Sequence, residues 1–312
     1  MGGAHIVPNG PVGGSGGKNF HETKWTTGIT LQKLGFWKDS DCLHCIELKW
    51  SNGSSVRHGK EIGDYKSISF SPGEKCTELI LWGNGRGTRA GRIQIHTDAG
   101  QSYDWGKDVS GQNAYPLNVG SGLLVGFGGA SATDDIYRLV PLFLEQLKSV
   151  EATIEFGQLP SGMDGISNLS LDSADFDGNH QAHFTFGNSM SKSITQEFIQ
   201  SATSSFGLSL KITAGIPEVA STEAGASWDW SNTSTHESSN SSTTTLSWGL
   251  EGDMEPGEKV HCQAYCWEGH ASINYTSKIT VTFNDGSTQG FSENGTYNGV
   301  DYSTAYATDT YS

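Results

Sequence analysis

Residues 206–230 read FGLSLKITAGIPEVASTEAGASWDW and contain two alternating segments on either side of a short break. In residues 206–213 and again in 220–230, apolar or small residues alternate with polar ones, which is the two-residue period of a β-strand. Gly215 and Pro217 interrupt strand pairing, so the sequence predicts a hairpin whose tip lies between these two arms. The predicted tip consists of Ala214, Gly215, Ile216, Pro217, Glu218 and Val219.

This hairpin has the dimensions of a pair of membrane-spanning strands. A strand that crosses a bilayer needs about ten residues with apolar side chains outward and polar ones inward, and each arm supplies about that number. One hairpin leaves unpaired backbone groups at its edges, so only a closed ring of several copies satisfies them in lipid. From the pattern alone, the alternative is a half-buried hairpin in a soluble β-sandwich.

The hairpin is followed by a Ser/Thr/Asn-rich run at 231–246 and by a predicted strand around Trp248. This order resembles the insertion hairpin of aerolysin-type pore-forming proteins, in which a hydrophobic Pro-containing tip anchors the assembled barrel and a polar track follows the second strand. Glu218 departs from the apolar tip of that family. Since an ionised carboxylate is costly inside a bilayer, we expect insertion to become easier once Glu218 is protonated.

The composition favours a β-rich chain and argues against nucleic acid as a partner. Of the 312 residues, 35% are hydrophobic, 41 are Gly and only 8 are Pro, which suits many strands joined by tight turns. The net charge of −15 is opposite in sign to the clustered Lys and Arg that attract nucleic acid or anionic lipid.

The N-terminal sequence MGGAHIVPNGPVGG lacks the apolar core of a signal peptide, and no window of about 20 apolar residues occurs in the chain. We therefore expect a soluble protein without a signal peptide, located in the cytoplasm or released by an unconventional route. We expect it to act at the surface of target membranes.

The first half of the chain contains short strand candidates separated by turn signals such as Ser51-Asn52-Gly53, a spacing typical of an all-β barrel, sandwich or prism. The predicted strands are 28–34, 45–50, 67–70, 78–82, 92–97, 123–127 and 136–143.

Four segments of this half resemble jacalin-type lectins, over about residues 7–147. They are GGSGG at 13–17, GEKCTELILWGN at 73–84, GRIQIHTDAGQSYDWG at 91–106 and LLVGFGGASATDDIYRLVPLFL at 123–144. The resemblance implies a β-prism of three four-stranded sheets that binds sugar between the first Gly-rich loop and a late GxxxD loop. It also implies cell-surface glycans, of mannose type or other N-glycans, as partners.

Carried over by position, the resemblance assigns carbohydrate-binding roles to residues of these two loops. Gly17 supplies the first-loop amide, because a residue without a side chain lets the backbone approach a hexose. Asp134 supplies the carboxylate that accepts hydrogen bonds from two hydroxyls, and Thr133 lines the pocket. Ala130 stands where the family motif has Gly, so Asp135 is the alternative carboxylate.

Other motifs of the first half are interpreted as structural. Tyr103 and Trp105 could stack on a sugar face, but we expect them in the core. The CLHC motif at 42–45 suggests a metal or redox site, yet no second ligand pair with finger-like spacing accompanies it and its context is strand-like. We therefore expect structural thiols, no metal and no cofactor.

Two glycine motifs match enzyme signatures. The GxSxG match at 13–17 lacks the helix that a nucleophile elbow requires, and the GxGxxA match at 85–90 precedes a strand where a dinucleotide site requires a helix. We expect the protein not to be an enzyme. A resemblance to natterin-like proteins, some of which are credited with protease activity, leaves a natterin-like protease as an alternative.

The second half contains longer alternating segments. The Ser-rich tract 231–245 fits either a disordered linker or a polar strand. The high β-propensity of Thr and the position of the tract between other strands favour a strand. Further strands are expected at 148–156, 260–267 and 271–283.

The expected fold class is all-β, with an N-terminal jacalin-like β-prism at 1–147 and an elongated aerolysin-type β-sheet pore-forming module at 148–312. The expected function is that of a glycan-binding, toxin-like pore-forming protein in innate defence or cytolysis. We expect a soluble monomer or dimer that assembles on the membrane into a ring of about seven or eight copies, or about 14 to 16 strands, which is wide enough for a channel. A soluble lectin without pore activity is the main alternative.

Overall fold

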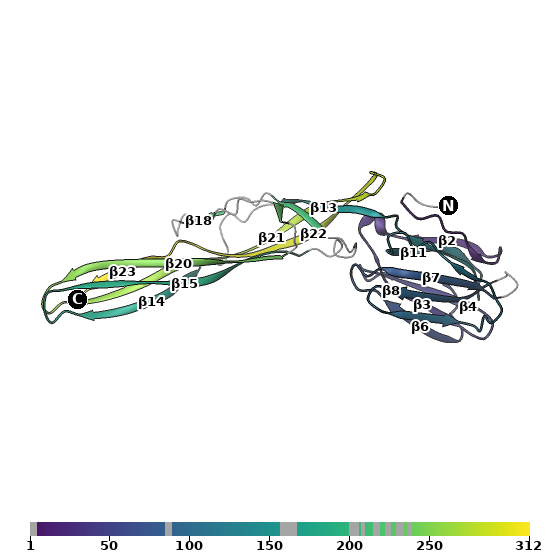
Figure 1. The fold of residues 1–312 in the computed structure, drawn as a ribbon, viewed down its shortest axis with the longest axis horizontal. Coiled ribbons are helices and arrows are strands. Elements are labelled where there is room, and N and C mark those ends of the chain that lie inside the picture. Colours follow the sequence, from purple (N-terminus) through teal and green to yellow (C-terminus); the bar gives the residue numbers. More distant parts are fainter. Residues whose placement is uncertain are drawn as a thin grey trace. The chain divides into compact units, whose positions relative to one another are not determined.

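The computed structural model describes residues 5–84, 89–156, 167–199, 206, 210–214, 219–221, 226–228, 234–235 and 239–312. Apart from the short 3-10 helix η1 (Trp25–Thr27), the named elements in these ranges are β-strands (Figure 1). No helix of the described ranges has the length and apolar character needed to span a bilayer. The chain divides into two compact units. The first is Met1–Ala152, Ser201–Leu210 and Lys278–Glu293, and the second is Thr153–Gln200, Lys211–Ser277 and Asn294–Ser312.

The first unit contains three four-stranded sheets, as expected for a β-prism, and all strand pairs within them are antiparallel. One sheet has the order β1 (Val12–Gly13), β12 (Ile136–Phe143), β11 (Leu124–Ser131), β2 (Lys18–Thr23). Another has the order β10 (Ala114–Pro116), β7 (Cys76–Gly83), β8 (Ala90–Thr97), β9 (Ser102–Gly106). The third has the order β5 (Ser55–Gly59), β4 (Leu43–Trp50), β3 (Leu31–Lys38), β6 (Asp64–Ser69).

The core of the prism comes from one face of each sheet. Alternate residues are fully buried along the strands, such as Ile93 and Ile95 in β8 and Leu34 and Phe36 in β3. The rings of Phe36 and Phe127, from two different sheets, meet edge to face with centroids 6.2 Å apart. The two-residue period of the sequence thus becomes three inner faces that share one core. Each predicted strand of the first half overlaps an observed one, whereas β1, β2, β5, β9 and β10 have no counterpart among the predicted strands.

The other long strands form a nine-stranded sheet with the order β19-β16-β13-β21-β22-β15-β20, and β14 and β23 also pair with β21. Its members are β13 (Leu147–Phe156), β14 (Ser167–Asp177), β15 (Ala182–Ile199), β16 (Leu210–Ala214), β19 (Ser234–Thr235), β20 (Ser239–Met254), β21 (Lys259–Phe283), β22 (Thr288–Tyr302) and β23 (Tyr306–Tyr311). The predicted domain boundary between residues 147 and 148 falls at the start of β13.

Strand β20 contains residues 239–245 of the polar tract, so the strand interpretation is confirmed for that part. It pairs with β15 in one register without a shift. Ser193 pairs with Thr243 and Thr195 pairs with Ser241, so polar residues face each other across this part of the ladder. Hydroxyl side chains at opposed positions, together with the β-propensity of Thr, explain why a segment with few apolar residues forms a strand.

Strand β21 is a single strand where the sequence predicts two, at 260–267 and 271–283. Its buried side chains occupy even-numbered positions up to Cys266 and odd-numbered positions at Ile273 and Tyr275. The buried side chains therefore lie on one face of the strand up to Cys266 and on the opposite face from Ile273 onward. Such a phase change interrupts the alternating pattern without ending the strand, which explains the predicted gap.

Candidate functional site

The Gly-rich loop at residues 14–17 joins β1 to β2 and lies against the end of the β11–β12 pair. Gly17 has a left-handed backbone with φ of +83°, and a Cβ at this position would lie 2.9 Å from the Ser131 carbonyl oxygen. A Cβ on Gly16 would collide with the ring of Tyr137. The backbone N–H of Gly14 donates to the Tyr137 carbonyl at 2.7 Å. The loop therefore needs glycine for both conformation and space.

Arg138 holds the same loop from β12. Its Nη1 donates to the carbonyl oxygens of Gly14 at 3.3 Å and Gly16 at 3.1 Å, and its Nη2 donates to Oδ1 of Asn19. The GxSxG match thus lies between two strands and is held by an arginine, an arrangement unlike a nucleophile elbow.

The second loop, between β11 and β12, carries the predicted carboxylates. The N–H of Ala132 donates to the carbonyl of Asp135 at 2.9 Å, which closes a four-residue turn. Ser131 pairs with Lys18, so this turn lies next to the Gly-rich loop. Thr133 is exposed. The Asp134 side chain is 56% exposed, and its Oδ1 lies 3.3 Å from Nζ of Lys60.

Asp135 has a different environment from its neighbour. Its Oδ2 accepts a hydrogen bond from Nε of Arg89 at 2.6 Å, and its Oδ1 lies 2.9 Å from Nδ1 of His44. Burial opposes ionisation of this carboxyl, but the Arg89 guanidinium holds its pKa below the ordinary value. The guanidinium itself stacks on the Tyr137 ring at 3.7 Å. Both oxygens of Asp135 are therefore engaged within the protein, whereas Asp134 faces solvent.

The CLHC motif at residues 42–45 lies next to this turn. The Cys42 Sγ donates to Oδ1 of Asp135 at 3.6 Å, and Nε2 of His44 lies 2.9 Å from Oδ2 of Asp39. Burial and the carboxylates of Asp135 and Asp39 raise the pKa of Cys42 to about 12. Burial opposes the charged form of His44, but the Asp134 carbonyl and the Asp39 carboxylate hold its pKa above the ordinary value. Cys42 is thus a protonated thiol here, not an activated nucleophile.

The remaining cysteines and aromatic residues of the first half behave as structural groups. All five cysteines are free and buried. Tyr103 is 1% exposed and its hydroxyl donates to the Lys66 carbonyl at 2.9 Å, while Nε1 of Trp105 donates to the Phe36 carbonyl at 3.0 Å. The prediction that Tyr103 belongs to the core is confirmed, whereas Trp105 is partly buried and packs against the core.

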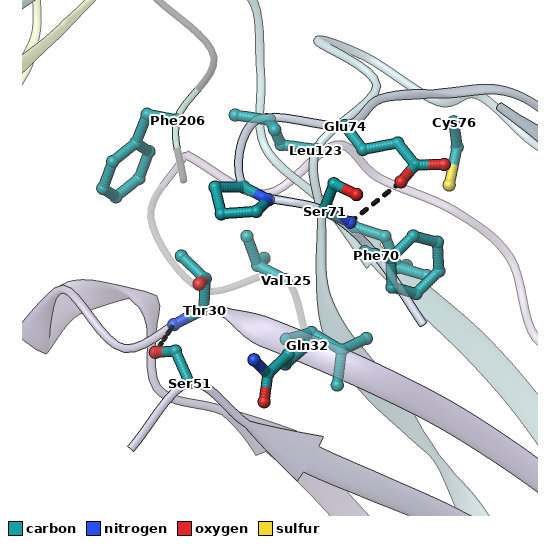
Figure 2. A pocket seen from close by; sticks show the side chains of 13 residues that line it. Thr30, Gln32, Ser51, Phe70, Ser71, Glu74, Cys76, Leu123, Val125 and Phe206 are labelled. Carbon is teal, nitrogen blue, oxygen red and sulfur yellow. Dashed lines mark hydrogen bonds between the residues drawn. The ribbon is translucent and has the colours of Figure 1, made fainter. Parts of the chain in front are cut away.

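Phe206, the first residue of the predicted hairpin, is buried within the first unit. It is 1% exposed and belongs to an apolar cluster with Trp25, Leu123 and Val125. Its ring lies 5.8 Å from that of Phe291. Figure 2 shows Phe206 at the edge of a cavity of about 150 Å³ that Leu123 and Val125 also line. In this conformation Phe206 is a core residue of the first unit.

The predicted tip lies only partly within the described residues. Ala214 ends β16 and Val219 begins β17 (Val219–Ser221), whereas Gly215, Ile216, Pro217 and Glu218 lie outside them. Strand β16 pairs with β19, and β17 pairs with β18 (Ala226–Trp228). The two pairings share one register, because Thr213 pairs with Ser234 and Ser221 pairs with Ala226.

In this register the chain reverses between Ser221 and Ala226. In this conformation Val219 is a strand residue paired with Trp228, and the assignment of residues 214–219 to a membrane-inserting tip stays a prediction. Gly225 is a second turn signal within the region taken as the second arm. The local sequence does not show whether the turn lies at Gly215 and Pro217 or near Gly225. The pairing of β16 with β19 decides between these positions.

Comparison with known proteins supports this architecture. Residues 9–139 match the family model of the jacalin-like lectin domain. The crystal structure of lamprey immune protein is similar with a TM-score of 0.78 and 22% identity, covering 98% of each chain. Two further similar structures are a Malaysian banana lectin (TM-score 0.36, 20% identity, 46% of this chain and 100% of that chain) and the mannose-binding lectin from champedak (0.36, 17%, 45% and 97%). No curated protein sequence matches the chain. The all-β prediction is confirmed: residues 9–139 match the jacalin-like lectin domain, and the fold of the chain as a whole is similar to that of lamprey immune protein.

Proposed function

We propose that this protein binds cell-surface glycans through its jacalin-like domain and forms transmembrane β-barrel pores through its second module. The observation that carries the glycan part is the exposed carboxylate of Asp134 beside the Gly-rich loop. The names of similar lectins include a mannose-binding one, which supports mannose-type glycans as ligands.

Three residues of the two loops form the proposed sugar site. Asp134 accepts hydrogen bonds from two adjacent hydroxyls, which are stronger than neutral ones because the acceptor is charged. Gly17 allows a hexose to approach the backbone, and Thr133 lines the same turn. Asp135 has a supporting role, because its ion pairs with Arg89 and His44 hold the turn that presents Asp134.

Replacing Asp134 by Asn tests this site. We expect Asp134→Asn to lose binding to a mannose-type neoglycoprotein by about ten- to a hundred-fold, since a hydrogen bond to a charged group contributes ~1.5–3 kcal/mol. Asp64→Asn, at an exposed carboxylate at the start of β6, is the matched control and should bind normally. Unchanged binding of Asp134→Asn together with a normal fold would reject the site.

The long ladder between β15 and β20 supports the pore part of the proposal. Its register includes the pair Glu197 and Ser239 at the end nearest the hairpin. Continuing this register one pair at a time closes the hairpin on Glu218, at the predicted tip. The pairing of β16 with β19 follows a different register, in which Thr213 pairs with Ser234. We propose that on insertion the register of the β16–β19 pairing is replaced by the register of the β15–β20 ladder. This exchange extends the ladder into a longer hairpin and places residues 214–219 in the membrane.

Two engineered disulfides distinguish this exchange. Paired strand positions lie within the Cα distance that a disulfide needs. Cysteines at Thr213 and Ser234 lock the register of the described conformation, and cysteines at Ser193 and Thr243 lock the ladder that persists in the proposed pore. We expect the first lock to abolish dye release from liposomes that carry mannose-type glycans, with recovery on reduction. The second lock should leave release intact.

Further outcomes of the same assay separate the alternatives. Leakage that survives the lock at residues 213 and 234 would reject the register exchange. If the wild-type protein also binds glycan but releases no dye, a soluble lectin without pore activity would be favoured. We further propose that the pore contains about seven or eight copies, which is wide enough for a water-filled channel. We propose cytolysis in innate defence as its biological role.

A further inference from the structure

Three ligand-type atoms converge behind the turn that carries Asp134. Nδ1 of His44, Oδ1 of Asp135 and Sγ of Cys42 form a triangle with sides of 2.9 Å for Nδ1 to Oδ1, 3.6 Å for Oδ1 to Sγ and 4.0 Å for Sγ to Nδ1. Tetrahedral zinc with bonds of about 2.0–2.3 Å separates its ligand atoms by about 3.3–3.7 Å. Shifts of a few tenths of an ångström would bring the three atoms to these separations.

More acceptors surround Nδ1 of His44 than one proton satisfies. The carbonyl oxygen of Asp134 lies 2.7 Å from this nitrogen, in addition to Oδ1 of Asp135. The His44 side chain is nine-tenths buried, and its other nitrogen, Nε2, lies 2.9 Å from Oδ2 of Asp39. A buried imidazole among several oxygens and a sulfur is an environment that a cation would stabilise.

Asp39 is placed to orient the imidazole. Its Oδ2 lies 2.9 Å from Nε2 of His44, and its Oδ1 accepts from the backbone N–H groups of Asp41 at 2.7 Å and Cys42 at 3.3 Å. A carboxylate on the far nitrogen of a histidine ligand is a common arrangement in metal sites, where it selects the tautomer and raises ligand basicity. The ligand atoms of Asp39, Cys42 and His44 all lie within 4.8 Å of one another.

We propose that Cys42, His44 and Asp135 bind a divalent transition metal ion, Zn²⁺ by the chemistry of its ligands, with Asp39 as the positioning residue. A thiolate and an imidazole favour Zn²⁺ over Mg²⁺ or Ca²⁺, which prefer oxygen ligands alone. Binding releases the thiol proton of Cys42 to solvent, Nδ1 of His44 binds in its unprotonated form, and a thiolate, a carboxylate and a dication leave the site close to neutral. The partial exposure of Asp39 (35%) and Asp135 (21%) provides access for the ion.

A metal at this position would tie the turn that carries Asp134 to the start of β4. This consequence for glycan recognition rests on the proposed function, but the metal site itself does not. The test therefore measures metal binding directly and leaves glycans out.

The experiment titrates the full chain with Co²⁺, a spectroscopic substitute for Zn²⁺. We expect a sulfur-to-cobalt charge-transfer band that saturates at one equivalent and disappears when Zn²⁺ is added. Cys42→Ser should lose the band, and Asp39→Asn should weaken binding by about 10- to 100-fold. Cys45→Ala is the matched control, because Cys45 is equally buried three residues away and its Sγ lies 3.7 Å from the Ile46 carbonyl, outside the triangle.

Calorimetric titration of the wild type with Zn²⁺ gives a measurement that does not depend on how the variants fold. One bound equivalent supports the site, provided that Cys45→Ala keeps the cobalt band. The absence of binding by the wild type would overturn the proposal and leave His44 as a structural residue between Asp39 and Asp135. A cobalt band that survives Cys42→Ser, or one that Cys45→Ala removes, would overturn it as well.

Discussion

Replacing Gly17 by Ala tests the geometry of the Gly-rich loop, and Gly53 provides its control. The two glycines have nearly the same backbone, with φ of +83° at Gly17 and +82° at Gly53. A Cβ on Gly53 would meet nothing within 4 Å, whereas a Cβ on Gly17 would lie 2.9 Å from the Ser131 oxygen and 3.1 Å from the Tyr137 ring. The pair therefore separates the cost of a left-handed backbone from the cost of crowding.

The left-handed conformation costs a non-glycine residue roughly 1–2 kcal/mol. We expect Gly53→Ala to lower the free energy of unfolding by about that amount. In Gly17→Ala, ordinary contact of 3.4 Å with the Ser131 oxygen requires a displacement of about half an ångström, and crowding of this kind costs about 1–3 kcal/mol more. The expected total for Gly17→Ala is about 2–5 kcal/mol.

Urea denaturation of the full chain, followed by near-ultraviolet circular dichroism, measures the stability difference. A mannose-type neoglycoprotein measures binding. Since Ser131 precedes the turn that carries Asp134, we expect Gly17→Ala to weaken glycan binding and Gly53→Ala to leave it unchanged. Equal stability losses and unchanged binding in both variants would refute the reasoning that the Gly-rich loop packs against this turn.

Two further predictions concern stability. Phe206→Ala should lower the free energy of unfolding by about 3–5 kcal/mol, because the ring is 1% exposed in the core of the first unit. The control Tyr115→Ala, at a side chain that is 47% exposed, should change the free energy of unfolding little. A loss below about 1 kcal/mol for Phe206→Ala would contradict the packing. Burial opposes ionisation of Glu47, but the Tyr65 hydroxyl and the Arg57 guanidinium hold its pKa below 4.5. The ionised Glu47 therefore stabilises the folded state above pH 4.5, and this stabilisation is lost as the pH falls through the lowered pKa. Glu47→Gln should therefore flatten the fall in stability below pH 4.5 in acid titrations, and a slope identical to that of the wild type would exclude Glu47 as its source.

The fold class and most of the strands follow from local sequence patterns. A two-residue apolar period specifies which face of a strand is buried, and turn residues delimit the strands, so both are local properties. Strand β5 had no predicted counterpart because its sequence, SVRHG, is polar and only partly buried. The single strand β21 was divided in the prediction because its buried face changes near Cys266.

Tertiary structure decided what distinguishes Asp134 from Asp135. The two are adjacent and chemically identical, but Arg89 and His44 reach Asp135 from 46 and about 90 residues away in the chain, whereas the Asp134 side chain is 56% exposed and pairs with the exposed Lys60. The same long-range approach brings Asp135 to the CLHC motif, which the sequence shows without a third ligand. Hydrogen bonds and ion pairs between distant segments form only once the sheets pack, so no local pattern encodes them.

The position of the hairpin turn has the same origin. The segment offers breaks at Gly215, Pro217 and Gly225, and each is compatible with alternating arms. Pairing with β19 selects the later reversal, whereas the ladder of β15 and β20 extrapolates to the earlier one. Register depends on which strands are neighbours, and because side chains alternate along every strand, several registers satisfy the same local pattern.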